Sequence, residues 1–381
     1  MVTVGILPGF LLAALAVLVR RDMPLTETHL GFSVACGFTA SALLSAPAGR
    51  VTSRIGSRMG FVVASGGVAT GLALITFAQS WLQLAIGLTV AGCGNAFMQV
   101  AANLRIARAV APGRHGVAFG VKQSAIPGAT MVAGVAVPTI AVTLGWRSTF
   151  AMATASAVLI MGWQLVQSRG SRTVEPGPIE VTASTMPPEL VRPVRAFTLG
   201  VGCAAAAATS LGTFLPEFAV GRGWTPENAG FLLAAGSALC ITSRVSFGLR
   251  IDTRPARGFP WVVVQLAAGA ASLVVLALSS GAAATLVPAV LVAFAAGWGW
   301  SGLFNFAIVR EAPEAPATVT GRTQAGVFAG GGAGPLLFGV IATRASYETA
   351  WLAAATCMAV GGALIARGQR VLARQAAMST A

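Results

Sequence analysis

Charged side chains are scarce in this chain. Only 9% of its 381 residues are charged, whereas 55% are hydrophobic, and the mean hydropathy is +0.78. One soluble core of this length cannot bury so many apolar side chains, which excludes a water-soluble globular protein. The alternating pattern of an outer-membrane barrel is absent too, while long apolar runs favour helices that satisfy their own backbone groups. The sequence therefore predicts an all-α membrane protein.

The residues that most enzymes need are also few. The two histidines, His29 and His115, lie at the ends of apolar runs, and no metal-ligating cluster or nucleophile with a nearby base is evident. The glycine run from Gly330 to Gly334 lacks the Lys-Ser/Thr pair of a phosphate loop. The five cysteines fall in apolar runs, where we interpret them as small buried hydrophobic residues. We therefore expect no catalysis, no metal site and no cofactor.

Twelve apolar runs, each about 20 residues long and so able to cross a bilayer, are separated by short polar breaks. They lie near residues 2–19, 30–48, 60–78, 82–104, 116–142, 148–167, 196–219, 228–249, 259–279, 284–308, 321–342 and 349–366. The polar stretch from Ser168 to Pro193 is rich in proline and glutamate and reads as a flexible linker. We predict an N-terminal six-helix bundle at 1–167, a cytoplasmic linker at 168–194 and a C-terminal six-helix bundle at 195–381.

The two halves of the chain repeat each other. His29-Leu30-Gly31-Phe32 returns as Asn228-Ala229-Gly230-Phe231, at an offset of 228−29 = 199. Such a duplication in a very apolar chain is typical of a transporter whose two homologous bundles face each other across a substrate path. At this offset Met1 pairs with Gly200, although the seventh run begins near Arg195, so we expect the natural start to lie upstream.

Arginine falls mainly on one side of the predicted membrane. With the N-terminus inside, eighteen arginines lie in or beside cytoplasmic segments, and the five outside are Arg20, Arg21, Arg147, Arg222 and Arg344. Positive residues accumulate on the cytoplasmic side, so the pattern predicts both termini in the cytoplasm and the inner membrane of a bacterium. Because these arginines form no basic patch with interleaved aromatics, the net charge of +14 does not indicate nucleic acid.

The segment after the second run combines glycines that permit a tight turn with regularly spaced arginines: Gly49, Arg50, Arg54, Gly56 and Arg58. It returns after the eighth run as Gly248, Asp252 and Arg257. Together with the twelve runs in two halves, this pattern resembles the major facilitator superfamily over the whole chain. The resemblance implies a twelve-helix secondary active transporter and a gating or coupling role for these residues. The first copy has Ser53 where the superfamily pattern carries an acidic residue.

Polar side chains recur every four residues along two runs, which places them on one face of each helix. Lipid penalises such side chains, so we interpret them as lining a substrate path. They are Asn95, Gln99 and Asn103, and Thr209, Thr213 and Glu217. The resemblance implies that both helices face the central cavity, together with Trp298, Trp300, Ser301 and Asn305 of the tenth run. Interhelical hydrogen bonding, worth about 1 kcal/mol for each residue, is the alternative role.

Two cations lie deep in predicted runs. Lys122, the sole lysine, lies about 9 Å inside the fifth run, beside Gln123, whose counterpart in the second half is Gln324. Arg244 lies similarly deep in the eighth run. A cation there costs at least ~2.5 kcal/mol unless it meets water, a partner or an anion. Both side chains are long enough to reach the cytoplasmic surface instead.

These features favour a secondary active transporter that moves a small organic anion, or a neutral metabolite, by alternating access. Lys122 and Arg244 would contact the anion, and Glu217 is a candidate for coupling or for the interface between the halves. An exporter of hydrophobic or zwitterionic drugs or metabolites is one alternative, and a transport-inactive membrane sensor is another. We expect a monomer that meets its substrate and membrane lipid, with proton, sodium or counter-substrate coupling left open.

Overall fold

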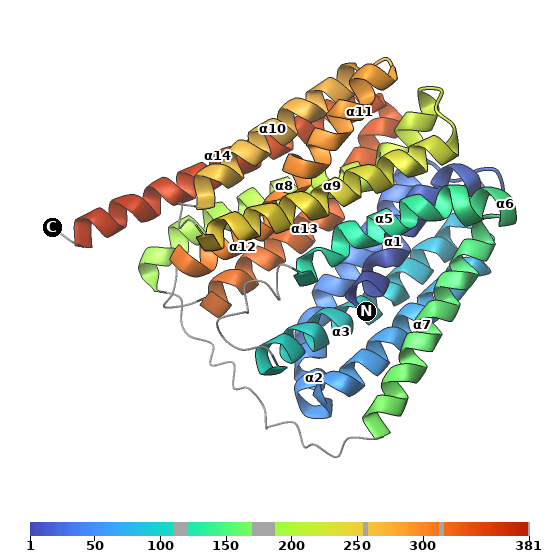
Figure 1. The fold of residues 1–381 in the computed structure, drawn as a ribbon, viewed down its shortest axis with the longest axis horizontal. Coiled ribbons are helices and arrows are strands. Elements are labelled where there is room, and N and C mark those ends of the chain that lie inside the picture. The colour runs from blue at the N-terminus through green and yellow to red at the C-terminus, as the bar shows by residue number, and fades with distance from the viewer. Residues whose placement is uncertain (110–120, 170–186, 254–257, 312–315, 380–381) are drawn as a thin grey trace. The chain divides into compact units, whose positions relative to one another are not determined.

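The computed structural model describes residues 1–109, 121–169, 187–253, 258–311 and 316–379. Every element in that part of the chain is a helix (Figure 1), as the apolar runs predict. Eleven helical stretches are long and apolar enough to cross a membrane. The all-α membrane fold is therefore confirmed, whereas the number of twelve spans stays a prediction.

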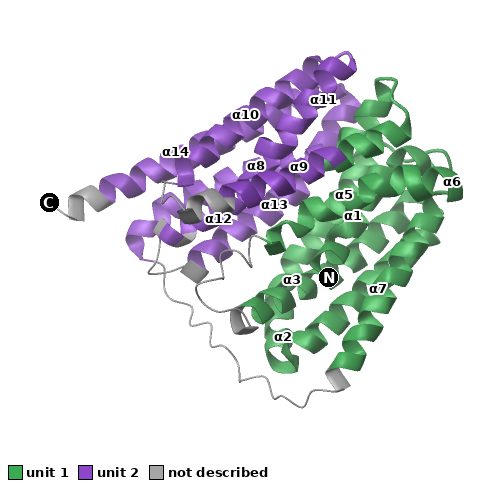
Figure 2. Cartoon of the chain, viewed as in Figure 1, with its two compact units in different colours: residues 1–181, 212–234 green, residues 182–211, 235–381 purple. Residues whose placement is uncertain are grey.

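The chain forms two compact units (Figure 2): unit 1 comprises residues 1–181 and 212–234, and unit 2 comprises residues 182–211 and 235–381. The helices are α1 (Val2–Val19), α2 (Glu27–Thr76), α3 (Trp81–Ala109), α5 (Ala125–Ala136), η2 (Val137–Ala141), α6 (Val142–Leu144), α7 (Trp146–Arg169), α8 (Pro188–Gly221), α9 (Pro226–Thr253), α10 (Gly258–Leu278), α11 (Ala283–Val292), η3 (Ala293–Trp298), α12 (Trp300–Glu311), α13 (Pro316–Arg344) and α14 (Tyr347–Ser379).

The two units do not follow the two sequence halves, because α8 and α9 are each shared between them. The predicted bundle boundaries therefore stay a prediction. α8 begins at Pro188, within the segment predicted as linker. Residues 170–186 of that linker lie outside the described part of the chain.

Unit 1 is organised around close helix pairs. α2 packs against α3 and α7, and α1 packs against α5 (Figure 1). A Cβ atom on Gly94 of α3 would lie 2.6 Å from the backbone nitrogen of Val68 in α2, so only glycine fits there. Small residues allow this approach in lipid, where helix association depends on packing. α1 is apolar and largely buried, as expected for a helix surrounded by protein.

Unit 2 contains an aromatic core. Phe197 of α8 stacks on Phe259 of α10 with ring centroids 4.7 Å apart, and both rings meet the edge of Phe304 in α12. α10 also packs against α14 and η3. A Cβ added at Gly269 would lie 2.4 Å from the Cα of Gly297, so the two backbones approach closely there. Large apolar side chains such as Val264 are exposed on the outer faces, as expected for surfaces that contact lipid.

The segment predicted as a loop between the second and third runs is mostly helical. The second run and all but the last two residues of the third fall within α2. This stretch of 50 residues is interrupted at Gly56, where φ is 83° and ψ is 161°. Gly49, which we expected to form part of a tight turn, lies inside the helix. The chain reorients at one residue because glycine alone adopts this combination of angles readily.

This geometry predicts opposite effects for two glycine substitutions in α2. Gly56→Ala places a Cβ on a backbone conformation that is nearly restricted to glycine, and we expect it to lower the unfolding free energy by about 1–3 kcal/mol. Gly49 is helical and a Cβ there would meet no atom within 4 Å, so Gly49→Ala should stabilise by about 0.5–1 kcal/mol. Thermal unfolding in detergent measures both, and equal effects would contradict the break at Gly56.

Candidate functional site

The first turn of α2 is held by a capping box. The Thr26 hydroxyl accepts a hydrogen bond from the backbone N–H of His29 at 3.2 Å, and the Thr26 N–H donates to His29 Nδ1 at 3.3 Å. The His29 ring also stacks on Trp81 of α3, with centroids 4.3 Å apart. Capping satisfies N–H groups that have no partner within the helix. The position of Glu27, the next residue after the cap, is fixed as a result.

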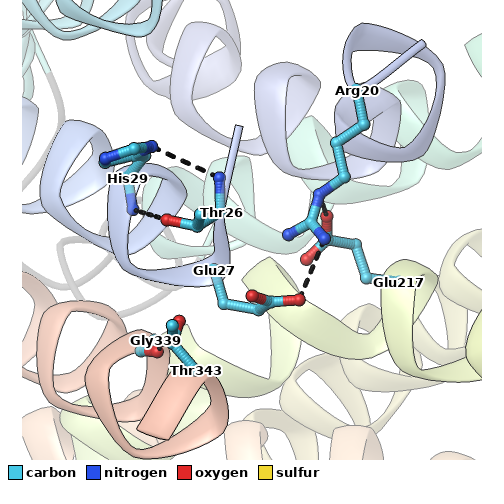
Figure 3. Close-up of polar contacts among 7 residues, drawn as sticks. All are labelled: Arg20, Thr26, Glu27, His29, Glu217, Gly339 and Thr343. Atoms are coloured by element: carbon cyan, nitrogen blue, oxygen red, sulfur yellow. Dashed lines mark hydrogen bonds and ion pairs between the residues drawn. The ribbon is translucent and has the colours of Figure 1, made fainter. Parts of the chain in front are cut away.

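Arg20 ends α1 and contacts two carboxylates (Figure 3). Its Nη1 lies 2.9 Å from Glu27 Oε1, and its Nε lies 2.9 Å from Glu217 Oε1 on α8. A cation is favoured at this position because the C-terminal end of a helix carries partial negative charge. We call Arg20, Glu27 and Glu217 the Arg20 cluster, all of which belongs to unit 1.

The Arg20 cluster is partly removed from solvent. The Glu217 side chain is only 5% exposed, compared with 19% for Glu27 and 32% for Arg20. Removing one member of a buried ion pair is strongly destabilising, because an uncompensated charge is left behind. The pair therefore holds the end of α8 against α1, and a close approach of Gly230 in α9 to Gly134 in α5 holds the same part of unit 1.

A second charged contact beside the end of α1 is exposed. Asp22 accepts hydrogen bonds from Trp146 Nε1 at 2.8 Å and Arg147 Nη1 at 2.6 Å, and these bonds hold the pKa of Asp22 below its usual value. Its contribution to stability is fully present above the ordinary carboxylate pKa and is lost as pH falls through the lowered one. Exposed pairs of this kind contribute little.

The predicted stripe on α3 takes part in contacts between helices. Asn95 is buried and donates to the Ser41 hydroxyl of α2 at 3.1 Å, and Ser41 donates to the Gly92 carbonyl at 2.8 Å. Gln99 donates to Asn95 Oδ1 at 3.3 Å and is half-buried, whereas Asn103 is exposed. The interhelical role is thus visible for Asn95, and the substrate-path role of the stripe stays a prediction.

The stripe on α8 is buried along its length. Counted over the whole residue, the exposed fraction is 6% for Thr209, 0% for Thr213 and 7% for Glu217. Thr209 belongs to unit 2, whereas Thr213 and Glu217 belong to unit 1. Of the three, Glu217 is joined to the Arg20 cluster.

Arg244 of α9 lies against the π-helical segment η3. It is buried, and its Nη2 donates to the backbone carbonyl of Trp298 at 2.8 Å. The adjacent Ser243 hydroxyl donates to the Ala295 carbonyl at 2.7 Å. π-helical turns disturb the regular backbone ladder and occur frequently at functional sites. α9 therefore supplies donors to carbonyls of an irregular segment of the tenth predicted span.

The remaining predicted substrate contacts differ in their surroundings. The rings of Trp298 and Trp300 are buried against Phe294 and Phe304, at centroid distances of 5.4 Å and 6.0 Å. The polar members Lys122, Gln123, Asn305 and Gln324 are all half-buried. Within the described part of the chain, no residue forms a hydrogen bond or ion pair with Lys122.

The predicted gating motif is only partly visible. Arg50 and Arg54 are exposed, and Arg58 is half-buried. Ser53, where the superfamily pattern has an acid, donates its hydroxyl to the Arg50 carbonyl at 2.9 Å. Of the second copy, Gly248 and Asp252 lie within α9 and Arg257 lies outside the described residues.

The sequence pattern did not point to Arg20 or its partner Glu27, nor to Gln265 in unit 2. Arg20 was assigned only to a loop facing outward, because nothing in the local pattern links it to Glu217. Gln265 is buried in α10, and neither its Nε2 nor its Oε1 forms a hydrogen bond with another described residue. The buried Trp300 Nε1 likewise forms no hydrogen bond with a described residue. A lone amide in the middle of an apolar run was the available signal for Gln265.

Helices of membrane-spanning length, a buried charge in one of them and a long helix broken at Gly56 define a polytopic membrane protein. The chain belongs to the Major Facilitator Superfamily, whose family model matches residues 2–324. A curated relative from Mycolicibacterium smegmatis, described as an MFS-type efflux pump, is 28% identical over 278 residues. That match covers 69% of this chain and 64% of the relative, so the chain spans less than two thirds of the relative's length.

The Arg20 cluster predicts an asymmetric response to substitution. Arg20→Met leaves Glu217 as a buried carboxylate without its cation, and we expect the unfolding free energy to fall by about 3–5 kcal/mol. Glu217→Gln should cost less, because Arg20 keeps Glu27. Adding Glu217→Gln to Arg20→Met should recover part of the loss in thermal unfolding measurements.

Arg147→Met is the control: it removes the exposed pair with Asp22 and a hydrogen bond to the Ala78 carbonyl, and should cost about 1–2 kcal/mol. A double variant as unstable as Arg20→Met alone would show that the ion pair is not the source of the effect.

Gln265 provides a separate test of the core of unit 2. Its amide bonds to no other described residue, so Gln265→Leu removes an unsatisfied buried polar group and should raise the unfolding free energy by about 1–3 kcal/mol. Gln99→Leu, which breaks the bond to Asn95, is the matched control and should not stabilise. A destabilising Gln265→Leu would contradict the expectation and indicate a bound polar partner.

Proposed function

We propose that this protein is a secondary active transporter that exports small organic anions across the bacterial inner membrane, with both termini in the cytoplasm. Lys122 carries this proposal. It lies in the candidate span Val121–Leu144, and no described residue pairs with it. A cation placed in a membrane is stabilised by water, a partner or an anion. A cargo anion would supply the missing charge.

The scarcity of intramembrane carboxylates supports the anionic cargo. No acidic residue occupies the middle of any apolar run in the sequence, so a cationic cargo has no evident counter-charge. Arg244 enters the proposal as the second cation, whose bond to the Trp298 carbonyl holds η3 in place. Export is proposed because the Mycolicibacterium relative is described as an efflux pump.

Glu217 enters the proposal as a gating residue. It lies in the part of α8 that packs within unit 1, where it pairs with Arg20. Opening of the outer side would separate this pair, and the separation would be favoured by water or a proton at the carboxylate. The Arg20 cluster would then hold the outer side closed until the pair is broken.

Lys122 variants in proteoliposomes test the cargo class. Loss of a charge-assisted hydrogen bond costs about 1.5–3 kcal/mol, so Lys122→Ala should reduce transport of organic anions about tenfold or more. Lys122→Arg should keep part of the activity because it keeps the charge. Arg105→Ala removes an exposed cation at the end of α3 and should have little effect.

The outcomes separate the candidate functions. Unimpaired anion transport by folded Lys122→Ala would overturn the anion site. Export of hydrophobic or zwitterionic compounds that is insensitive to this variant would favour the alternative cargo. A folded wild-type protein with no flux of any compound in the screen would favour a membrane sensor.

A further inference from the structure

Two cysteines from distant parts of the sequence meet in unit 2. Cys203 lies on α8 and Cys357 lies on α14, and the Cys357 thiol lies 3.5 Å from the Cys203 carbonyl oxygen. The contact is a hydrogen bond that the Cys357 thiol donates from α14 to the backbone of α8. Both residues belong to unit 2. The pair therefore brings two nucleophilic sulfur atoms to one place.

The close approach of α8 and α14 explains this contact. A Cβ on Gly361 would lie 2.7 Å from the Gly200 carbonyl oxygen and 3.3 Å from the Cys203 Cβ. Cys357 precedes Gly361 by four residues, which places both on one face of α14. Disulfides require short distances between the two backbones and between the Cβ atoms. The glycine contact places α8 and α14 at such short range.

The other three cysteines are Cys36 and Cys93, which are also half-buried, and Cys240. Cys36 lies on α2, and Cys240 on α9 is fully buried. Cys203 and Cys357 are both half-buried. A small oxidant that dissolves in the membrane can therefore reach the pair more readily than Cys240.

We propose that Cys203 and Cys357 form a redox-modifiable dithiol. The two thiols lose two protons and two electrons to a membrane-soluble quinone, which becomes the hydroquinone, and one S–S bond forms. This bond joins residues 188–211 of α8, the part that belongs to unit 2, to α14. Because the other end of α8 belongs to unit 1, the crosslink restrains a helix shared by both units and slows transport until a thiol reductant restores the pair.

The test uses the full-length protein in proteoliposomes, which is treated with a quinone, then denatured and alkylated so that buried thiols also react. In the wild type, Cys36, Cys93 and Cys240 should stay reduced and become alkylated. Mass spectrometry should find the Cys203 peptide joined to the Cys357 peptide. Quinone treatment should consume no thiol in Cys203→Ser or in Cys357→Ser, because each variant lacks one partner of the pair. Cys240→Ser should still form the crosslink. Cys357→Ala replaces Cys357→Ser if that variant does not fold.

Retention of all five wild-type thiols, or equal thiol loss in Cys203→Ser, overturns the proposal. The transport measurement rests on the proposed function, with a severalfold and reductant-reversible loss expected only when both cysteines are present. A crosslink without that loss overturns the switch. A wild type without flux, whose thiols still crosslink, shows failure of the transport proposal and not of the dithiol.

Discussion

Lipid offers no hydrogen bonds to the backbone, and this constraint governs most of the structure. Every described element is helical because a helix satisfies its own N–H and carbonyl groups. Where the helical ladder is irregular, side chains complete it. Ser243 and Arg244 of α9 donate to the Ala295 and Trp298 carbonyls of η3. Part of the polar content of the predicted spans therefore serves the fold itself.

The same constraint separates two kinds of intramembrane polar residue. Asn95 is buried, and its amide is satisfied by Ser41 and Gln99. Lys122 makes no bond to another described residue. A polar group that the protein does not satisfy has to meet water, a lipid headgroup or a ligand. That difference is the physical reason for placing the proposed anion at Lys122 and not at Asn95.

Charge near the ends of the helices has a different role. The capping box at Thr26 and the end of α1 at Arg20 place complementary charges beside each other, and α8 adds Glu217. A buried pair of this kind is favourable while both partners stay together and costly when one is left alone. Separating Arg20 from Glu217 is therefore costly, and the proposed gating role of Glu217 rests on that cost.

The sequence by itself determined the membrane class and most helix positions, because hydropathy over about 20 residues reports directly on burial in lipid. The predicted run 2–19 corresponds to α1, Val2–Val19. The apolar runs in two halves, together with the repeated glycine and arginine spacing, indicated the superfamily that the family match confirms. The sequence did not show that residues 49–58 are helical except at Gly56. Hydropathy reports burial in lipid, and it does not distinguish a polar helical turn from a polar loop.

Only the tertiary structure decided which distant residues meet. The pairings of Arg20 with Glu217 and of Cys203 with Cys357 join segments far apart in the chain. Neither pairing has a local pattern, because it arises from the rotation and depth of two packed helices. Close glycine contacts set that depth in both units, and they depend on the partner helix as much as on the glycine itself.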